Sequence, residues 1–180
     1  MSKVRVLVRQ PFFISNPCLI GDDVAEYDGI THFLKAAPRR LADAFELLEP
    51  PSYKPKSSDA SHRNLRAAIY LAGYVVECIL KAYIISMQSA QTLRAASVAL
   101  QQKGVDASNL FSVKGHNIQL LLSFTDLEAA PLPEDIKTSL GICSKWKSTW
   151  RYSPDPVQTE YAREFVISAE RIFEFVRNRI

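Results

Sequence analysis

The chain has 180 residues, of which 47% are hydrophobic and 23% charged, and its formal net charge is +3. This composition is typical of one globular domain with a substantial core, and it excludes a chain that is disordered over its whole length. A net charge of this size does not by itself indicate a nucleic-acid-binding protein, because binding depends on where the basic side chains cluster.

The cysteine pattern and the first residues bear on the cellular compartment. The three cysteines, Cys18, Cys78 and Cys143, lie far apart and form no C-x-x-C pair, so the sequence indicates neither a disulfide framework nor a zinc site. Residues 1–21 contain no acid, and two arginines and a proline interrupt the apolar run that a secretory signal requires. We therefore expect a cytoplasmic protein without a metal or a cofactor.

Residues 1–30 are predicted to form an N-terminal arm, or extension, of the domain. In the sequence KVRVLVR, Val4, Val6 and Val8 alternate with other residues at the two-residue period of a β-strand. The acidic segment GDDVAEYDG that follows has the composition of a loop. The arm is thus expected to include one short strand.

The pattern from Thr31 onward is helical. In AAPRRLADAFELLE, Pro38 is expected near the start of a helix, where its missing N–H is harmless, and Pro50 and Pro51 end that helix. Further helices are predicted at about 62–87, 91–102 and 115–127, after Pro133, and from the SPDP sequence to the C-terminus. These helices predict an all-α domain over residues 31–180, folded as an up-and-down helical bundle.

The second predicted helix is the most apolar segment of the chain. Its longest run without a charge, residues 67–76, is too short to cross a membrane, and Glu77 and Lys81 follow it, each costly in lipid. On a helical wheel the apolar side chains cover most of the surface and leave one narrow polar strip: Arg66, Tyr70, Tyr74, Glu77 and Lys81. We expect no membrane span, but a helix in the middle of the bundle or at a subunit interface, with its polar strip facing a groove.

Three motifs give the chain a resemblance to a known family. The sequences AAIYLAGYVVECILKAYI, KGHNIQLLL and WRYSPDP, followed by a long amphipathic helix, resemble the HEPN family of helical domains over residues 66–85, 114–122 and 146–180. The resemblance does not cover the first 30 residues. It implies a helical bundle that forms a dimer, with a cleft at the dimer interface. Many members look like metal-independent ribonucleases of toxin–antitoxin, CRISPR or phage-defence systems. Others look like non-catalytic RNA- or nucleotide-binding modules that work beside a nucleotidyltransferase.

The nuclease signature of that family is an arginine and a histidine separated by four to six residues. Arg151 matches the arginine and Tyr152 follows it, but Pro156, Val157 and Gln158 stand where the histidine is expected. The imidazole that would activate the ribose 2′-hydroxyl is therefore missing at this place in the sequence. This departure from the signature favours a cleft near Glu77, Lys81 and Arg151 that binds without efficient cleavage.

Each candidate side chain also has a purely structural interpretation. Glu77 and Lys81 form either a simple ion pair at a polar interface or, from the resemblance, part of a dimer cleft. Arg151 is a candidate for a phosphate contact. Its neighbours in KWKSTWRY mix cations with aromatic rings as single-stranded nucleic-acid sites do, although tryptophans are more often buried. His116 is a candidate general base, but no acid stands near it in the sequence, and a residue at a helix start is the simpler interpretation.

The sequence leaves three hypotheses open. The first is a HEPN-like homodimer of a toxin–antitoxin or phage-defence system that binds RNA or nucleotide without efficient cleavage. Its binding candidates are Arg66, Tyr74, Glu77, Lys81, Arg151 and Tyr152. The second hypothesis is a metal-independent ribonuclease toxin whose divergent site uses Arg151 with Glu77 or His116. The third is a protein-interaction module paired with an antitoxin or a nucleotidyltransferase.

Overall fold

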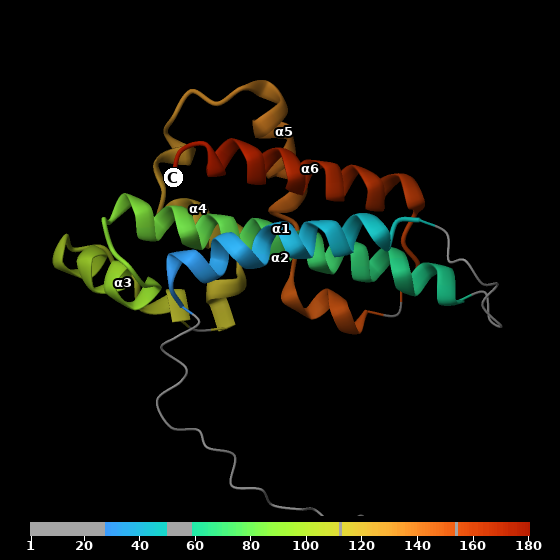
Figure 1. The fold of residues 1–180 in the computed structure, drawn as a ribbon, viewed down its shortest axis with the longest axis horizontal. Coiled ribbons are helices and arrows are strands. Elements are labelled where there is room, and N and C mark those ends of the chain that lie inside the picture. The colour runs from blue at the N-terminus through green and yellow to red at the C-terminus, as the bar shows by residue number, and fades with distance from the viewer. Residues whose placement is uncertain (1–27, 50–58, 112, 154) are drawn as a thin grey trace, which may run out of the picture.

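The computed structural model describes residues 28–49, 59–111, 113–153 and 155–180 (Figure 1). The predicted N-terminal strand and almost all of the arm lie outside these residues. The α-helices of the described chain are α1 (Ile30–Glu46), α2 (Asp59–Met87), α3 (Leu93–Gln102), α4 (Ile118–Ser123), α5 (Glu134–Cys143) and α6 (Thr159–Arg177). Short 3-10 helices connect them, and no strand occurs among the described residues. The prediction of an all-α helical bundle is therefore confirmed.

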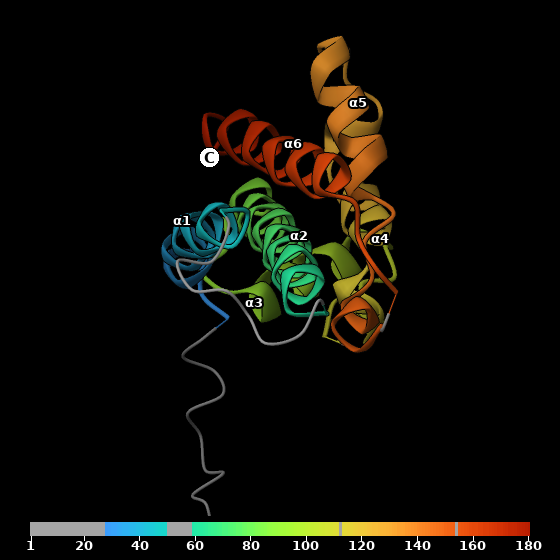
Figure 2. The same cartoon turned by 90° about the vertical axis from the view of Figure 1, so that its right-hand side faces the viewer.

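Helix α2 is the centre of the bundle. Figure 1 shows α1 running antiparallel to it and α6 running in the same direction as it. In Figure 2, seen along the bundle, α1 and α6 lie on neighbouring sides of α2, and α5 stands at a steep angle beside α6. Every residue from 75 to 85 is buried. A helix that is apolar around most of its circumference is covered on most sides because no single face could bury all of these side chains.

By length and composition alone, the stretch Asn64–Met87 of α2 is apolar enough to cross a membrane. However, 83% of its most hydrophobic window is buried inside the bundle. The helix contacts α1, α3, α4 and α6, so its apolar side chains have little surface left to meet lipid. The structure therefore indicates that α2 is the core helix of the bundle.

Helix α1 begins earlier than the sequence pattern suggests. The prediction that Pro38 lies near a helix start was wrong, because α1 begins at Ile30 and Pro38 lies inside it. A proline there removes one backbone donor and costs about 3 kcal/mol in a helix interior. Ala37, Leu41 and Ala44 are buried in the core that α1 shares with α2. This burial of apolar surface offsets the local cost.

The predicted single helix over residues 115–127 was also wrong. The segment is divided between α4 and two 3-10 helices, η3 (Val113–His116) and η4 (Asp126–Glu128). The side chains of Asn117 and Thr125 each accept a hydrogen bond from a backbone N–H two or three residues later. Such caps compete with a continuous helix and restart the chain as separate short elements. Helices α2, α3, α5 and α6 lie close to their predicted positions.

The segment after α5 is attached to α2 through Trp146. Its indole is 2% exposed and lies on the backbone of α2 at Gly73, where an added Cβ would overlap the pyrrole ring. The burial that the sequence favours is therefore confirmed for Trp146, whereas Trp150 stays partly exposed. The next element, the 3-10 helix η5 (Ser148–Tyr152), also contacts α2. It carries Arg151 to the polar strip of α2.

Substitution of Gly73 tests this attachment. In Gly73→Ala the new methyl group must displace the buried indole of Trp146, so we expect the free energy of unfolding to fall by about 1–3 kcal/mol. Gly141→Ala in α5 is the matched control, because an added Cβ there meets no atom within 4 Å. Alanine is the better helix former by about 1 kcal/mol, and the control should keep or gain stability. Urea denaturation measures both variants, and equal stability of the two would contradict the close contact.

Candidate functional site

The polar strip of α2 contains a buried carboxylate. Glu77 is 3% exposed, and its Oε1 accepts a hydrogen bond from Lys81 Nζ at 2.6 Å. Nδ1 of His116 lies 3.0 Å from both carboxylate oxygens. Lys81 is 8% exposed, and its Nζ lies 5.9 Å from the ring centroid of Phe33 in α1. A carboxylate is tolerated at this depth because it is paired and hydrogen-bonded.

The contact with Glu77 orients the ring of His116. A carboxylate accepts hydrogen bonds but donates none, so Nδ1 carries a proton in this contact and Nε2 is the acceptor of the neutral ring. The His116 side chain is 38% exposed, so a ligand can reach it. An acid that holds an imidazole in this way is the arrangement of general acid–base pairs. Sequence reasoning missed the pair because its members are 39 residues apart, on α2 and η3.

Tyr74 lies between His116 and two further aromatic rings. Its ring centroid is 6.3 Å from that of His116, 5.8 Å from that of Trp146 and 5.2 Å from that of Tyr70. Burial, a hydrogen bond with Tyr70 and the nearby Glu77 carboxylate raise the pKa of Tyr74 to about 12. The phenol therefore stays protonated at neutral pH.

Arg151 adds an exposed cation beside the same strip. Its Nη1 donates a hydrogen bond to the hydroxyl of Tyr70 at 3.1 Å, and its guanidinium carbon lies 4.6 Å from the ring centroid of Tyr152. Tyr152 is itself 73% exposed, and Lys145 and Lys147 are exposed as well. Within the described ranges Arg151 has no ion pair with an acid. We call these five residues the Arg151 surface.

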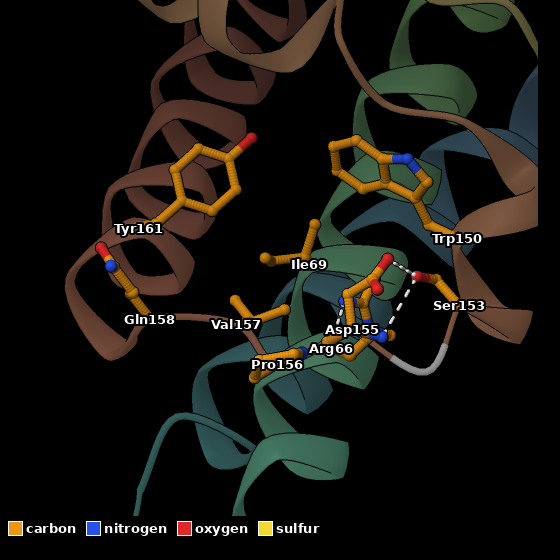
Figure 3. Close-up of a pocket in the computed structure, with 9 residues that line it drawn as sticks. All are labelled: Arg66, Ile69, Trp150, Ser153, Asp155, Pro156, Val157, Gln158 and Tyr161. Atoms are coloured by element: carbon orange, nitrogen blue, oxygen red, sulfur yellow. Dashed lines mark hydrogen bonds between the residues drawn. The ribbon is translucent and has the colours of Figure 1, made fainter.

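Arg66 lies at a third place. Its guanidinium donates a hydrogen bond to the backbone carbonyl of Asp155 and lines a cavity of about 500 Å³ between α2, η5 and α6 (Figure 3). Of three cavities on the described surface, none is lined by Glu77, Lys81 or Arg151. The carboxylate of Glu77 thus faces His116 and Lys81 in the interior of the chain and lines none of these cavities.

Apart from Arg66, the predicted residues therefore form two groups, an inner group around Glu77 and an exposed group around Arg151. Tyr70 joins them, because its ring packs against Tyr74 on one side while its hydroxyl binds Arg151 on the other. The inner group consists of the buried Glu77 and Lys81 with the partly exposed Tyr74 and His116, and the exposed group is the Arg151 surface.

The thiols of the described chain are unsuited to nucleophilic chemistry. Cys78 and Cys143 are buried and form no disulfide. Burial raises the pKa of the Cys78 thiol to about 12, so it is not ionised at neutral pH. No group of three His, Cys, Asp or Glu side chains in the described part of the chain is placed to hold a metal ion.

No family model, no curated protein and no solved structure matches the chain. The resemblance to HEPN domains rests on the three sequence motifs and stays a prediction. The chemistry of the side chains around α2 is therefore the basis for proposing a function.

Replacement of Glu77 tests the buried pair. Glu77→Gln leaves the Lys81 ammonium buried without its carboxylate, so we expect the free energy of unfolding at pH 7 to fall by about 3–5 kcal/mol. The double variant Glu77→Leu with Lys81→Met removes both charges and should lose less than the single variant. Urea denaturation of the two proteins gives the comparison.

Glu134→Gln is the matched control for this experiment. Glu134 pairs with Lys137 at 3.5 Å, but its side chain is 86% exposed. An exposed pair of this kind contributes little, so the control should change stability by less than about 1 kcal/mol. Similar losses in Glu77→Gln and Glu134→Gln would show that the carboxylate of Glu77 is not buried as described.

Proposed function

We propose that the protein is a HEPN-like domain that binds single-stranded RNA or a nucleotide through the Arg151 surface. The observation that carries the proposal is an exposed guanidinium beside two tyrosine rings, with no carboxylate paired to it among the described residues. Exposed lysines at positions 145 and 147 add positive charge on the same segment.

Both parts of this surface suit a nucleic acid. A guanidinium presents several N–H donors in one plane, a geometry that matches phosphate oxygens. Exposed aromatic rings offer faces on which bases stack, each stack contributing about 1–3 kcal/mol. The ring of Tyr152 is 73% exposed, and covering it with a base would remove this apolar surface from water.

The wider setting is proposed from the sequence resemblance. We propose a cytoplasmic homodimer in a toxin–antitoxin or phage-defence system, with an antitoxin or a nucleotidyltransferase as a further partner. If the protein is instead a pure interaction module, the antitoxin or nucleotidyltransferase binds the domain and RNA does not.

The contact between Glu77 and His116 favours a second candidate function, RNA cleavage without a metal ion. In this reaction Nε2 of His116 takes the proton of a ribose 2′-hydroxyl while the 2′-oxygen attacks the adjacent phosphorus. The bond from phosphorus to the 5′-oxygen breaks, and that oxygen takes up a proton from solvent water, which leaves a cyclic phosphate and a 5′-hydroxyl. His116 afterwards returns its proton to the solvent. Arg151 would stabilise the negative charge that develops on the phosphate.

Binding is tested by fluorescence anisotropy of a labelled single-stranded RNA across a salt series. We expect the affinity to fall as salt rises, because phosphate contacts release counterions. Arg151→Ala should weaken binding and reduce the slope of log K against log salt by about 1. Arg171→Ala is the matched control, since Arg171 lines a separate groove between α5 and α6. Equal losses in the two variants would contradict the proposal, and no binding at low salt would favour the interaction module.

Cleavage is tested separately, with the same RNA in a buffer that contains a chelator. If the second candidate function is right, the wild-type protein produces fragments that end in a cyclic phosphate. His116→Gln and Arg151→Ala should each slow this cleavage by about 100-fold or more, because both groups act in the transition state. Intact RNA in a sample that still binds it would exclude the nuclease. Cleavage that neither variant affects would contradict the assignment of His116 and Arg151.

A further inference from the structure

The cavity beside Arg66 is a second feature of the α2 surface that the Arg151 surface does not include. Two aromatic side chains form its walls, Trp150 from η5 and Tyr161 from α6. Figure 3 shows their rings on opposite sides, with Ile69 of α2 between them. The volume of about 500 Å³ lies within the range of pockets that hold small ligands.

The two rings are held by packing in the core. The ring centroid of Trp150 lies 6.2 Å from that of Phe165, and the ring centroid of Tyr161 lies 6.3 Å from it. Phe165 itself is fully buried in α6. Walls that are ordered before a ligand arrives reduce the entropy lost on binding. The cavity is thus suited to a flat, rigid molecule that contacts the rings.

The charges around the cavity balance, which favours a neutral ligand. Arg66 and Asp155 are the charged lining residues, and their charges are opposite. The Asp155 carboxylate accepts a hydrogen bond from Ser153 Oγ at 2.6 Å, and Arg66 is bonded to the backbone carbonyl of Asp155. A phosphate in the cavity would be attracted by Arg66 but repelled by this carboxylate, so the two charges give it no net attraction. A neutral ligand with N–H groups would instead donate to the carboxylate, and the Gln158 amide adds a further donor and acceptor to the lining.

We infer that this cavity binds one nucleobase, stacked on Trp150, with an exocyclic amino group directed to the carboxylate of Asp155. The inference rests on the proposed function only in choosing a nucleobase among flat, neutral molecules. The phosphates of a bound RNA remain outside the cavity at the neighbouring Arg151, which follows Trp150 directly in η5. Adenine, guanine and cytosine carry the amino group, whereas uracil has none. The N3–H of uracil lies between two carbonyl oxygens that the carboxylate repels, so uracil binds less well.

Isothermal titration of the full chain with adenosine, uridine and ribose 5-phosphate tests the inference. We expect adenosine to bind with an affinity that salt changes little, and about 10-fold more tightly than uridine, because uridine has no amino group to donate to the carboxylate. Ribose 5-phosphate has no base and should not bind. Asp155→Asn should weaken adenosine binding by about 10-fold. Trp150→Leu removes the stacking face and should weaken it further.

Glu160→Gln is the matched control, because Glu160 lies in the first turn of α6 and does not line the cavity. Absence of adenosine binding at millimolar concentration would overturn the inference, and so would equal binding by wild type and Asp155→Asn. Circular dichroism shows whether Trp150→Leu is folded. If Trp150→Leu is unfolded, adenosine binding by Asp155→Asn alone tests the inference. RNA binding without adenosine binding would overturn this inference alone. Adenosine binding without salt-dependent RNA binding would overturn the proposed function and support the cavity.

Discussion

The indole of Trp146 lies directly on α2 because residue 73 is a glycine. This close approach holds the chain after α5 against the polar strip of α2, and η5 follows within two residues. Arg151 and Tyr70 are 81 residues apart, and their hydrogen bond exists only while η5 stays in this position. The Arg151 surface and the cavity beside Trp150 both depend on this packing. A single missing Cβ therefore determines where the exposed cation and rings lie relative to α2.

A second constraint is the desolvated carboxylate of Glu77. A buried ion pair seldom stabilises a fold more than well-packed apolar side chains would, yet loss of one partner is costly. Burying Glu77 and Lys81 beside His116 costs desolvation free energy, so a gain in stability alone does not account for this cluster. Its distinct effect is to hold the imidazole in one orientation at the edge of the bundle, with Tyr74 beside it. Charge clusters of this kind are frequent at functional sites, which is why His116 is a candidate for chemistry.

The helices with strong apolar periods could be predicted from the sequence, and the wheel of α2 identified the residues of its polar strip. The helix breaks at Asn117 and Thr125 could not be predicted from the sequence, because a side-chain cap outweighs an apolar pattern that continues through it. Pro38 lies inside α1 because burial against α2 outweighs a local preference. The contact of Glu77 with His116 joins residues 39 positions apart, and no spacing rule reaches that far. The cavity between Trp150 and Tyr161 likewise exists only in the folded chain.

In the proposed function, RNA contacts the aromatic and basic residues of η5 beside α2. Ultraviolet cross-linking of the protein to a single-stranded RNA, followed by mass spectrometry of the peptides, locates these contacts. Phe111, on the 3-10 helix η2 (Ser108–Phe111), is an internal comparison because its ring is 49% exposed. We expect adducts at Tyr152 or Trp150 and none at Phe111. Adducts at Phe111 with none on η5 would contradict the proposed function.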